Sequence, residues 1–598
     1  MDKRKKIYLM ECLKIVYKID FIPSCMILVL KLVSALVPTL QTLVVAEFIN
    51  YVTTGKVNLL EDSYIRIIIL LMVILVAYIW ISKSLIELLG AHVEMKVNAE
   101  FKPKLVEKIS RLEYRFMEDG DTRDKISRVN SDVSVRVKDA YMEILRLVEL
   151  ILKVVGILII MFTQVWWASL FILVISVPCF YVSMKSGKAE YDAEAEVSKI
   201  NRVNAYYNEM LKNREYRDER SLFQYQNTFI TRFSKQYEDA RKFKTRIKLK
   251  WYIRMKMGSM ATIVVSAVMI AVLVPLTLNG RLSIGMFMAL TNSVFNIVQN
   301  MSWDLTWAID RNTWFNEYFK DMESIWNMEE EDVNFVDKKK VHVFESLEFK
   351  NVFFRYPGTE KYILNNLSFK IVKDKNYAFV GANGVGKSTI IKLINGLYKE
   401  YDGQILVNGQ DIREYHRGFI ATIFQDFARY PISVKDNIVI SRQDIVGDKE
   451  VEKIVEEVGL KSTISKLNNG INTVLGKFKK NSVDVSGGEW QKIALARCGI
   501  SNAPVQILDE PTSAMDPIYE TMIYKKFKEI SKGRTMILIS HRLASVQMSD
   551  IIFVLENGTL VEEGTHFNLV RQGGVYEKMY KEQAKWYREE GEWDKYEL

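Results

Sequence analysis

The fold of the second half of the chain is decided by one stretch, Gly381-Ala-Asn-Gly-Val-Gly-Lys-Ser-Thr389. It follows the apolar run Tyr377–Val380 and leads into the helix-like segment Thr389–Asn395. This order of strand, glycine-rich loop and helix is typical of a phosphate-binding loop, in which backbone N–H groups and the helix N-terminus surround an anion. In such a loop Lys387 reaches the β- and γ-phosphates of a nucleotide, and the Ser388 hydroxyl binds Mg²⁺. A glycine-rich turn that binds nothing is the alternative.

Two carboxylates follow another apolar run, Val505–Leu508. Asp509, at the end of this predicted strand, is placed to hold Mg²⁺ opposite Ser388. Glu510 is placed to polarise a water molecule that attacks the γ-phosphate. An ordinary turn also accommodates an Asp-Glu pair, but the phosphate-binding loop upstream favours the catalytic interpretation.

Short β-like runs alternate with helical segments throughout this half of the chain, which predicts an α/β domain with a mostly parallel sheet. The expected strands include Leu347–Phe354, Tyr377–Val380, Ile405–Val407, Val505–Leu508 and Met536–Ile539.

Length and charge limit the classes of protein that fit. A chain of 598 residues is too long for one hydrophobic core, so several domains are expected. The net charge of +9 is modest, and the basic residues concentrate near apolar segments, which indicates membrane topology and not nucleic-acid binding. The 4 cysteines are scattered, so neither a disulfide framework nor a zinc site is predicted.

The first half contains six apolar stretches, each near the ~20 residues needed to cross a bilayer. They are Phe21–Ala46, Arg66–Lys83, Leu145–Thr163, Trp166–Met184, Met257–Leu278 and Ile284–Asn300. Lys and Arg crowd the long loops 96–138 and 185–250, which places these loops and the basic N-terminus in the cytoplasm. No clean apolar segment follows the N-terminus, so a cleaved signal peptide is not expected.

The two long loops have helical periodicity, which predicts helices that continue beyond the membrane. Each has an irregular patch at its far end, Phe116–Asp121 and Lys212–Asp218. Such a patch either contacts another domain or forms a solvated turn.

Polar groups inside the spans are costly and often functional. Lys31 either extends to the interface or faces a cavity, and Glu149 and Lys153 form an i,i+4 pair that favours mutual neutralisation. One polar and aromatic helix face is expected in the last span, either as a cavity wall or as interhelical hydrogen-bond partners. Its members are Asn292, Asn296, Gln299, Trp303, Trp307 and Asp310.

With these motifs in this order, the chain resembles ABC transporters, specifically a half-transporter of the exporter type, over nearly its whole length. The resemblance implies that Tyr356 stacks on adenine, that Gln425 contacts Mg²⁺ and the attacking water, and that His541 is the switch histidine. It also implies that Asp509 holds Mg²⁺ together with Ser388, and that Glu510 is the catalytic carboxylate. The ATP-binding residues it implies are Gly381, Ala382, Asn383, Gly384, Val385, Gly386, Lys387, Ser388 and Thr389 of the Walker A loop and Ser486, Gly487, Gly488 and Glu489 of the signature sequence. The segment Ser513–Asp516 matches the D-loop.

The signature sequence of one subunit meets the Walker A loop of another in this family, so the resemblance implies a dimer. A symmetric homodimer is the default, and a heterodimer with a related half stays open. Val485 and Glu489 depart from the usual Leu and Gln of the signature. Gln506 places a polar group in the Walker B strand and is expected to weaken that strand slightly. The two loop patches match the coupling helices of exporters in position.

The sequence therefore predicts a membrane α-helical domain with six transmembrane helices and long cytoplasmic extensions, followed by an α/β P-loop NTPase domain of ABC type. The expected division is a transmembrane domain over 1–328, a linker over 329–342, a nucleotide-binding domain over 343–582 and a tail over 583–598.

The expected function is ATP-driven export of a peptide, lipid or amphipathic small molecule by alternating access. It requires ATP and Mg²⁺ and takes place in the plasma membrane of a bacterium, with the N-terminus and the nucleotide-binding domain in the cytoplasm. One alternative is an importer built on the same fold, as in some siderophore systems. The other is an ATPase that regulates a channel or partner without transport.

Overall fold

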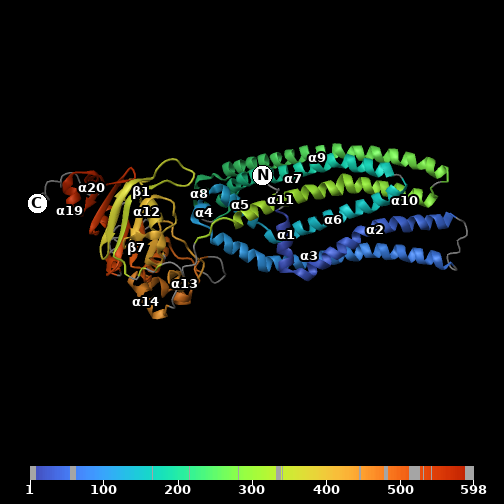
Figure 1. Ribbon diagram of the computed structural model, residues 1–598. Coiled ribbons are helices and arrows are strands. Elements are labelled where there is room, and N and C mark those ends of the chain that lie inside the picture. Colours follow the sequence, from blue (N-terminus) through green and yellow to red (C-terminus); the bar gives the residue numbers. More distant parts are fainter. Residues whose placement is uncertain are drawn as a thin grey trace. The chain divides into compact units, whose positions relative to one another are not determined.

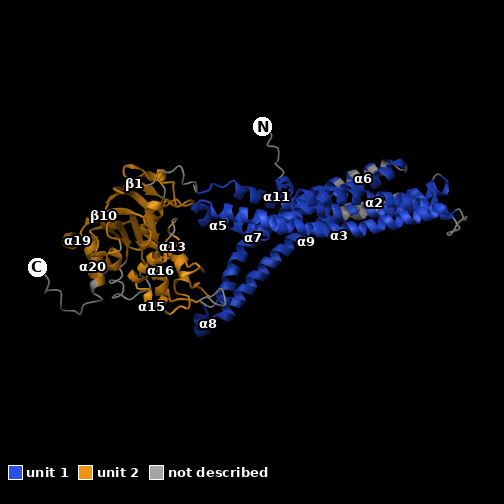
Figure 2. Ribbon diagram, turned by 90° about the horizontal axis from the view of Figure 1, so that it is seen from below, with its two compact units in different colours: residues 1–331 blue, residues 332–598 orange. Residues whose placement is uncertain are grey.

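The computed structural model describes residues 8–53, 62–164, 166–213, 216–280, 282–331, 339, 341, 343–415, 417–442, 446–476, 483–510, 525–529, 531–540 and 542–585. The chain forms two compact units, Met1–Glu331 and Asp332–Leu598 (Figure 2).

The described part of the first unit is helical, and its long helices lie side by side (Figure 1). α2 packs on α3, α6 and α10, and α7 packs on α9 and α11. The elements are α1 (Met10–Ile19), α2 (Phe21–Thr53), α3 (Ser63–Ser110), α4 (Tyr114–Glu118), α5 (Gly120–Asn130), α6 (Val133–Gln164), α7 (Trp166–Lys212), α8 (Arg217–Phe223), α9 (Gln226–Leu278), α10 (Ile284–Gln299), the π-helical turn η2 (Asn300–Leu305) and α11 (Thr306–Trp326).

The first five predicted spans fall inside α2, α3, α6, α7 and α9, and the sixth, Ile284–Asn300, consists of α10 and the first residue of η2. By length and composition, α2 and α3 are apolar enough to cross a membrane among the residues that the structure describes. The 48 residues of α3 extend about 70 Å, which exceeds the ~30 Å hydrocarbon core of a bilayer. The helices therefore continue well beyond the membrane, as the periodicity of the loops predicted.

Short helices mark the two irregular patches between the long helices. α4 overlaps the first patch, and α8 begins at the end of the second, of which residues 214–215 lie outside the described part. The carboxylate of Asp119 starts α5, because it accepts hydrogen bonds from the backbone N–H (2.8 Å) and the hydroxyl (2.6 Å) of Thr122.

The predicted polar face of the last span is not continuous. Asn292 and Trp303 are exposed, but Asp310 is buried, and the carbonyl of Asp310 lies against Gly187 of α7. The π-helical turn η2, which contains Trp303, lies between Asn292 and Asp310 and adds a residue to the turn, so the positions that follow it are shifted from the face that 3.6-residue spacing predicts. The side chain of Gln299 lies outside the described residues.

The second unit contains two sheets in its described part. A four-stranded antiparallel sheet has the order β2-β1-β4-β5, and a six-stranded sheet has the order β10-β9-β3-β8-β7-β6. The strands are β1 (Ser346–Phe354), β2 (Leu364–Val372), β3 (Asn376–Gly381), β4 (Asp402–Val407), β5 (Gln410–Asp411), β6 (Ile420–Ile423), β7 (Val505–Asp509), β8 (Thr535–Ile539), β9 (Ile551–Glu556) and β10 (Thr559–Gly564).

The strand prediction was right in position but wrong in part about the sheet. β3, β6, β7, β8 and β9 are parallel, whereas the strands predicted at Leu347–Phe354 and Ile405–Val407 are β1 and β4 of the antiparallel sheet. Their pairing depends on long-range register, which short apolar runs do not encode.

The described part of the second unit also contains helices. They are α12 (Lys387–Ile394), α13 (Val434–Val439), α14 (Asp448–Glu457), α15 (Lys461–Ile464), α16 (Gly487–Gly499), α18 (Leu543–Val546), α19 (His566–Gln572) and α20 (Val575–Lys585), with 3₁₀ turns η3 (Ile412–Glu414), η4 (Arg417–Phe419) and η5 (Gly470–Asn472).

The parallel register brings the ends of three strands to one edge. Phe379 of β3 and Asp509 of β7 both pair with Ile539 of β8, so the residues that follow these strands meet at that edge. This edge, at the carboxyl ends of parallel strands, is where α/β proteins bind ligands.

Gln506 is fully buried in β7, and both ends of its amide are paired. Its Nε2 donates to the carbonyl of Cys498 at 3.2 Å, and its Oε1 accepts from the Ser531 hydroxyl. A buried polar group with partners does not carry the penalty of an unsatisfied one. The residue therefore links β7 to α16 and to the segment before β8, instead of weakening the strand as the sequence suggested.

Candidate nucleotide-binding site

The loop between β3 and α12 has the backbone that a phosphate cradle needs. Gly384 and Gly386 have φ values of +79° and +110°, which L-residues rarely adopt. A Cβ on Gly386 would also lie 2.6 Å from Leu364 Cδ2, so this position accepts only glycine without a rearrangement. Gly386 is the N-cap of α12, and the loop therefore ends on a helix N-terminus.

Lys387 is buried in the first turn of α12. Its ammonium donates to the carbonyls of Gly381 (2.8 Å) and Ala382 (3.0 Å), which hold it against the loop. Burial lowers the pKa of this lysine, and the nearby carboxylates of Glu510 and Asp509 oppose that shift. The cation therefore lies in the electrostatic range of both predicted acidic groups.

Asp509 ends β7 and is buried, and the Ser388 hydroxyl donates a hydrogen bond to its carboxylate. Burial raises the pKa of Asp509 to about 6, with a further rise from Glu510, while Ser388 and Lys387 act in the opposite direction. A hydroxyl and a carboxylate in contact are oxygen donors of the kind Mg²⁺ prefers, so these residues fit the predicted metal.

Glu510 follows β7 in a left-handed backbone conformation, with φ of +47°. Its N–H donates to the carbonyl of Ile539 at 3.0 Å, which ties this conformation to the end of β8. Non-glycine residues in this region cost free energy and cluster at functional sites. The conformation sets the direction in which Glu510 leaves the sheet.

A cavity of about 500 Å³ collects most of the predicted nucleotide residues. Glu510 and Gln425, which follow neighbouring strands β7 and β6, line it together with Tyr356 and the Walker A loop. The full lining is Tyr356, Ile363, Asn383, Gly384, Gly386, Lys387, Ser388, Thr389, Gln425 and Glu510. Ile363 was not predicted, because an apolar residue ahead of a strand carries no motif signal.

Ser486 begins the signature helix α16 as its N-cap. The backbone N–H of Glu489 donates to the Ser486 hydroxyl at 3.3 Å, and the Glu489 carboxylate accepts from the Ser486 N–H at 2.7 Å, which makes a capping box. The hydroxyl of Thr463 also donates to this carboxylate at 2.7 Å. Although partial burial opposes it, these hydrogen bonds lower the pKa of Glu489.

The signature residues and the Walker A cavity are separate in this chain. Among the described residues, Ser486, Gly487, Gly488 and Glu489 do not line the cavity that holds Lys387. Glu489 uses its side chain to cap α16, a role that its place in the signature did not predict. The D-loop segment 513–516 and His541 lie outside the described residues.

Two family models match the chain. One, described as ABC transporter, matches residues 364–513, and the other, described as ABC transporter transmembrane region, matches residues 24–301. The chain belongs to the ABC transporters. This ABC transporter therefore combines the membrane and nucleotide-binding regions in one polypeptide, binds ATP, and couples ATP hydrolysis to transport.

Two curated proteins illustrate its relatives. The transporter is 28% identical over 557 residues to the subtilin transport ATP-binding protein SpaT of Bacillus subtilis, with 92% of this chain and 89% of SpaT covered. It is 39% identical over 241 residues to the ATP-dependent lipid A-core flippase of Escherichia coli (strain K12), with 40% of this chain and 41% of the flippase covered.

The fold resembles a solved structure, that of a bacterial Atm1-family ABC exporter with ATP bound. The TM-score is 0.73 at 20% identity, with 93% of this chain and 98% of that chain covered. The predicted family, fold class and ATPase activity are thus confirmed. These relatives are named as a transport protein, a flippase and an exporter, and so they do not favour the importer or the regulatory ATPase.

Proposed function

We propose that this ABC transporter is one half of a dimeric exporter in the plasma membrane of a bacterium. Its substrate is a peptide, a lipid or an amphipathic small molecule, moved by alternating access, and its N-terminus and nucleotide-binding domain face the cytoplasm. The observation that carries the proposal is the cavity in which Tyr356, the Walker A loop, Gln425 and Glu510 converge. A relative named for subtilin transport and one named as a lipid flippase support this range of substrates.

The proposed residue roles are those that the family resemblance implies, and the lining of that cavity supports several of them. Tyr356 stacks on adenine, the Walker A amides and Lys387 hold the phosphates, and Glu510 accepts a proton from the attacking water. Ser388, Gln425 and Asp509 hold Mg²⁺, which neutralises phosphate charge when bound. His541 is the proposed switch residue.

The proposed domain division is a transmembrane domain over 1–328, a linker over 329–342, a nucleotide-binding domain over 343–582 and a tail over 583–598. Half-transporters of this kind generally dimerise, and a homodimer is the simplest arrangement. In that dimer Ser486, Gly487, Gly488 and Glu489 complete the partner's ATP site. The short helices α4 and α8 at the ends of the long helices serve as coupling helices.

Flux in membrane vesicles tests the proposal. Inverted vesicles from cells that produce the transporter are given ATP outside, and accumulation of labelled peptides, lipids and amphipathic dyes is followed with and without vanadate. We expect vanadate-sensitive accumulation that the Glu510→Gln variant lacks. ATP-dependent loss of substrate from these vesicles would show import, and ATPase activity without flux of any substrate would contradict transport.

A further inference from the structure

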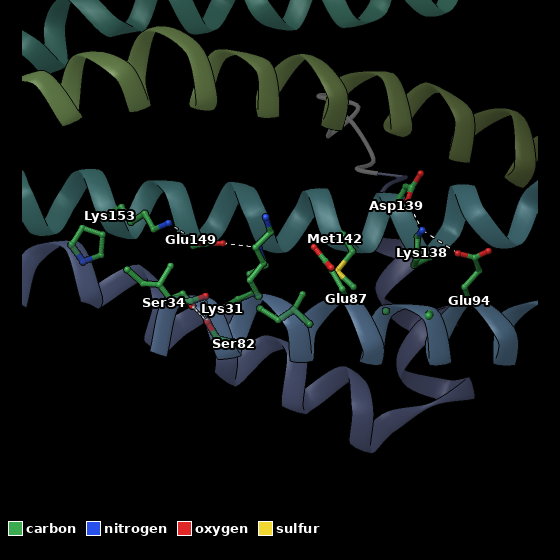
Figure 3. A pocket seen from close by; sticks show the side chains of 16 residues that line it. Lys31, Ser34, Ser82, Glu87, Glu94, Lys138, Asp139, Met142, Glu149 and Lys153 are labelled. Carbon is green, nitrogen blue, oxygen red and sulfur yellow. Dashed lines mark hydrogen bonds and ion pairs between the residues drawn. The ribbon is translucent and has the colours of Figure 1, made fainter. Parts of the chain in front are cut away.

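A second cavity, of about 610 Å³, lies between α2, α3 and α6 of the membrane unit. Figure 3 shows charged side chains at both ends of it, with Met142 and Glu87 between them. Apolar side chains also line it, among them Pro38, Ile79 and Ile86. The cavity thus combines an apolar wall with charged ends.

One end of the cavity is basic. The Glu149 carboxylate accepts from Lys31 Nζ at 2.8 Å and from Lys153 Nζ at 2.5 Å, and these side chains are between 10% and 22% exposed. Lys83 of α3 lines the same cavity, one helical turn before Glu87. With two lysines to one glutamate, the end at Glu149 carries a formal excess of one positive charge. Lys31 therefore lines a cavity and is paired with Glu149, which fits the cavity-facing interpretation of this lysine.

The other end is acidic. Lys138 Nζ lies 3.0 Å from Glu94 Oε2 and 3.0 Å from Asp139 Oδ1, and Glu87 lines the cavity between the two ends. With one lysine to two carboxylates, this end carries a formal excess of one negative charge. From Lys138 to Glu149 and Lys153, α6 rises about 17 to 22 Å, so the two ends are well separated.

The basic end can receive an anion without leaving a buried charge unpaired. If Lys31 turns to a ligand carboxylate, Glu149 keeps its i,i+4 partner Lys153. Removing one partner from a buried ion pair is costly when the other charge is stranded. Here two lysines share one carboxylate, so that cost does not arise. The hydroxyls of Ser34 and Ser82, which also line the cavity, add hydrogen-bonding groups at this end.

We propose that this cavity binds the transported substrate and that the substrate is an amphipathic peptide, with its carboxylate at Lys31 and a basic group near Glu87 and Asp139. This inference rests on the export function proposed above. The distance between the charged ends favours a peptide as the substrate. About five extended peptide residues span 17 Å, whereas the two charges of a zwitterionic lipid headgroup lie only a few bonds apart. The apolar wall between the ends suits apolar side chains.

Peptide binding to the full-length transporter in phosphatidylcholine nanodiscs tests the inference. The probe is a tritiated pentapeptide of two lysines followed by three apolar residues, prepared with a free carboxylate and with a C-terminal amide. We expect the free acid to bind the wild type about tenfold more tightly, because hydrogen bonds between charged groups contribute more than neutral ones. The Lys31→Gln variant should remove this difference, and Lys199→Gln, on the cytoplasmic extension of α7, should retain it.

A second variant tests whether the acidic groups of the cavity bind the basic part of the peptide. Glu87→Gln should weaken the dilysine peptide several-fold but leave a peptide with glutamines in place of the lysines unchanged. The inference would be overturned if the wild type bound the free-acid and amidated peptides equally, or if Lys31→Gln lost the same affinity for both peptides. The comparison of the two peptides on the wild type needs no variant. Lys31→Arg keeps the positive charge and should bind as the wild type does.

Failure of the proposed peptide site can be distinguished from failure of the proposed export function. Basal ATPase activity depends on the nucleotide-binding unit and should be retained in the Lys31 and Glu87 variants. If inverted vesicles accumulate a lipid or dye while neither peptide binds, the peptide site is overturned and export stands. Absence of ATP-driven flux of every substrate would instead contradict the export function.

Discussion

The phenolic oxygen of Tyr356 lies 2.9 Å from the hydroxyl oxygen of Thr389. This hydrogen bond joins the segment after β1 to the first turn of α12, the helix that follows the Walker A loop. Phe354 and Tyr398 pack edge-on against the Tyr356 ring, with centroids 5.2 and 5.5 Å away. The aromatic ring is thus held in a defined position beside the phosphate cradle.

The position of this ring predicts a loss of nucleotide affinity in Tyr356→Ala. Removing an aromatic that stacks on a base costs ~1–3 kcal/mol, so we expect ATP to bind on the order of tenfold more weakly. Tyr356→Phe keeps the ring and should lose much less. Binding of a fluorescent ATP analogue measures both, with Tyr362→Ala, an exposed tyrosine outside the cavity lining, as the control. Unchanged affinity in Tyr356→Ala would contradict stacking.

Glu510→Gln keeps the size of the side chain and removes the base. We expect ATP hydrolysis to fall by on the order of 100-fold, in line with general-base contributions, while ATP binding persists. Phosphate release and nucleotide binding are measured on the same preparation. The exposed Glu529→Gln serves as the control and should hydrolyse ATP normally. Near-normal turnover in Glu510→Gln would show that another group activates the water.

The separation of the signature sequence from the Walker A cavity predicts sites shared between two subunits. Ser486→Arg should still bind ATP at its own Walker A loop but block hydrolysis at its partner's site. Mixed with Lys387→Ala subunits, it should form dimers with one intact site and one doubly disrupted site.

Because Ser486 also caps α16, the matched control is Ser433→Arg, which removes the cap of α13. Ser433→Arg should retain ATPase activity. In phosphate-release assays, the mixed Ser486→Arg and Lys387→Ala dimers should recover about half the wild-type activity. Normal hydrolysis by Ser486→Arg alone is incompatible with a shared site.

The buried amide of Gln506 predicts that a single substitution destabilises the protein more than a matched double substitution. Ser531→Ala leaves Gln506 Oε1 without a donor and should lower the free energy of unfolding by ~1–3 kcal/mol. Adding Gln506→Leu removes that group, and the carbonyl of Cys498 keeps the Ser501 N–H as a partner. The double variant should therefore recover most of the loss. Hydrogen exchange of the β7 and β8 amides measures it, and additive losses would show that the hydrogen bond is not important.

Accessibility along α10 tests whether the polar face lines an aqueous cavity. A cysteine at Asn292 should react with aqueous thiol reagents, since reaction requires the thiolate and water. A cysteine at Val294, which is fully buried against other helices, should not react. Trapping with ATP and vanadate should lower the reactivity at Asn292. If both positions react equally, or neither does, Asn292 is better explained as an interhelical hydrogen-bond partner.

Local sequence determined the parts of this transporter whose physics is local. The Walker A loop was predictable because L-residues other than glycine rarely adopt the backbone of Gly384 and Gly386, and because strand, loop and helix follow each other directly. The helical spans were predictable because the bilayer demands long apolar segments. Asp509 and Glu510 were predictable from their place at the end of a buried strand.

Only the tertiary structure decided which distant residues meet. The sequence paired Glu149 with Lys153, four residues on, but the contact with Lys31 depends on how α2 packs against α6, which no local pattern encodes. Likewise, the side chain of Gln506 finds its partners in α16 and in the segment before β8. Asp310 is buried beyond a π-helical turn that the residue spacing does not predict. Periodicity carries information about one element at a time, whereas these contacts depend on packing between elements that lie far apart in the chain.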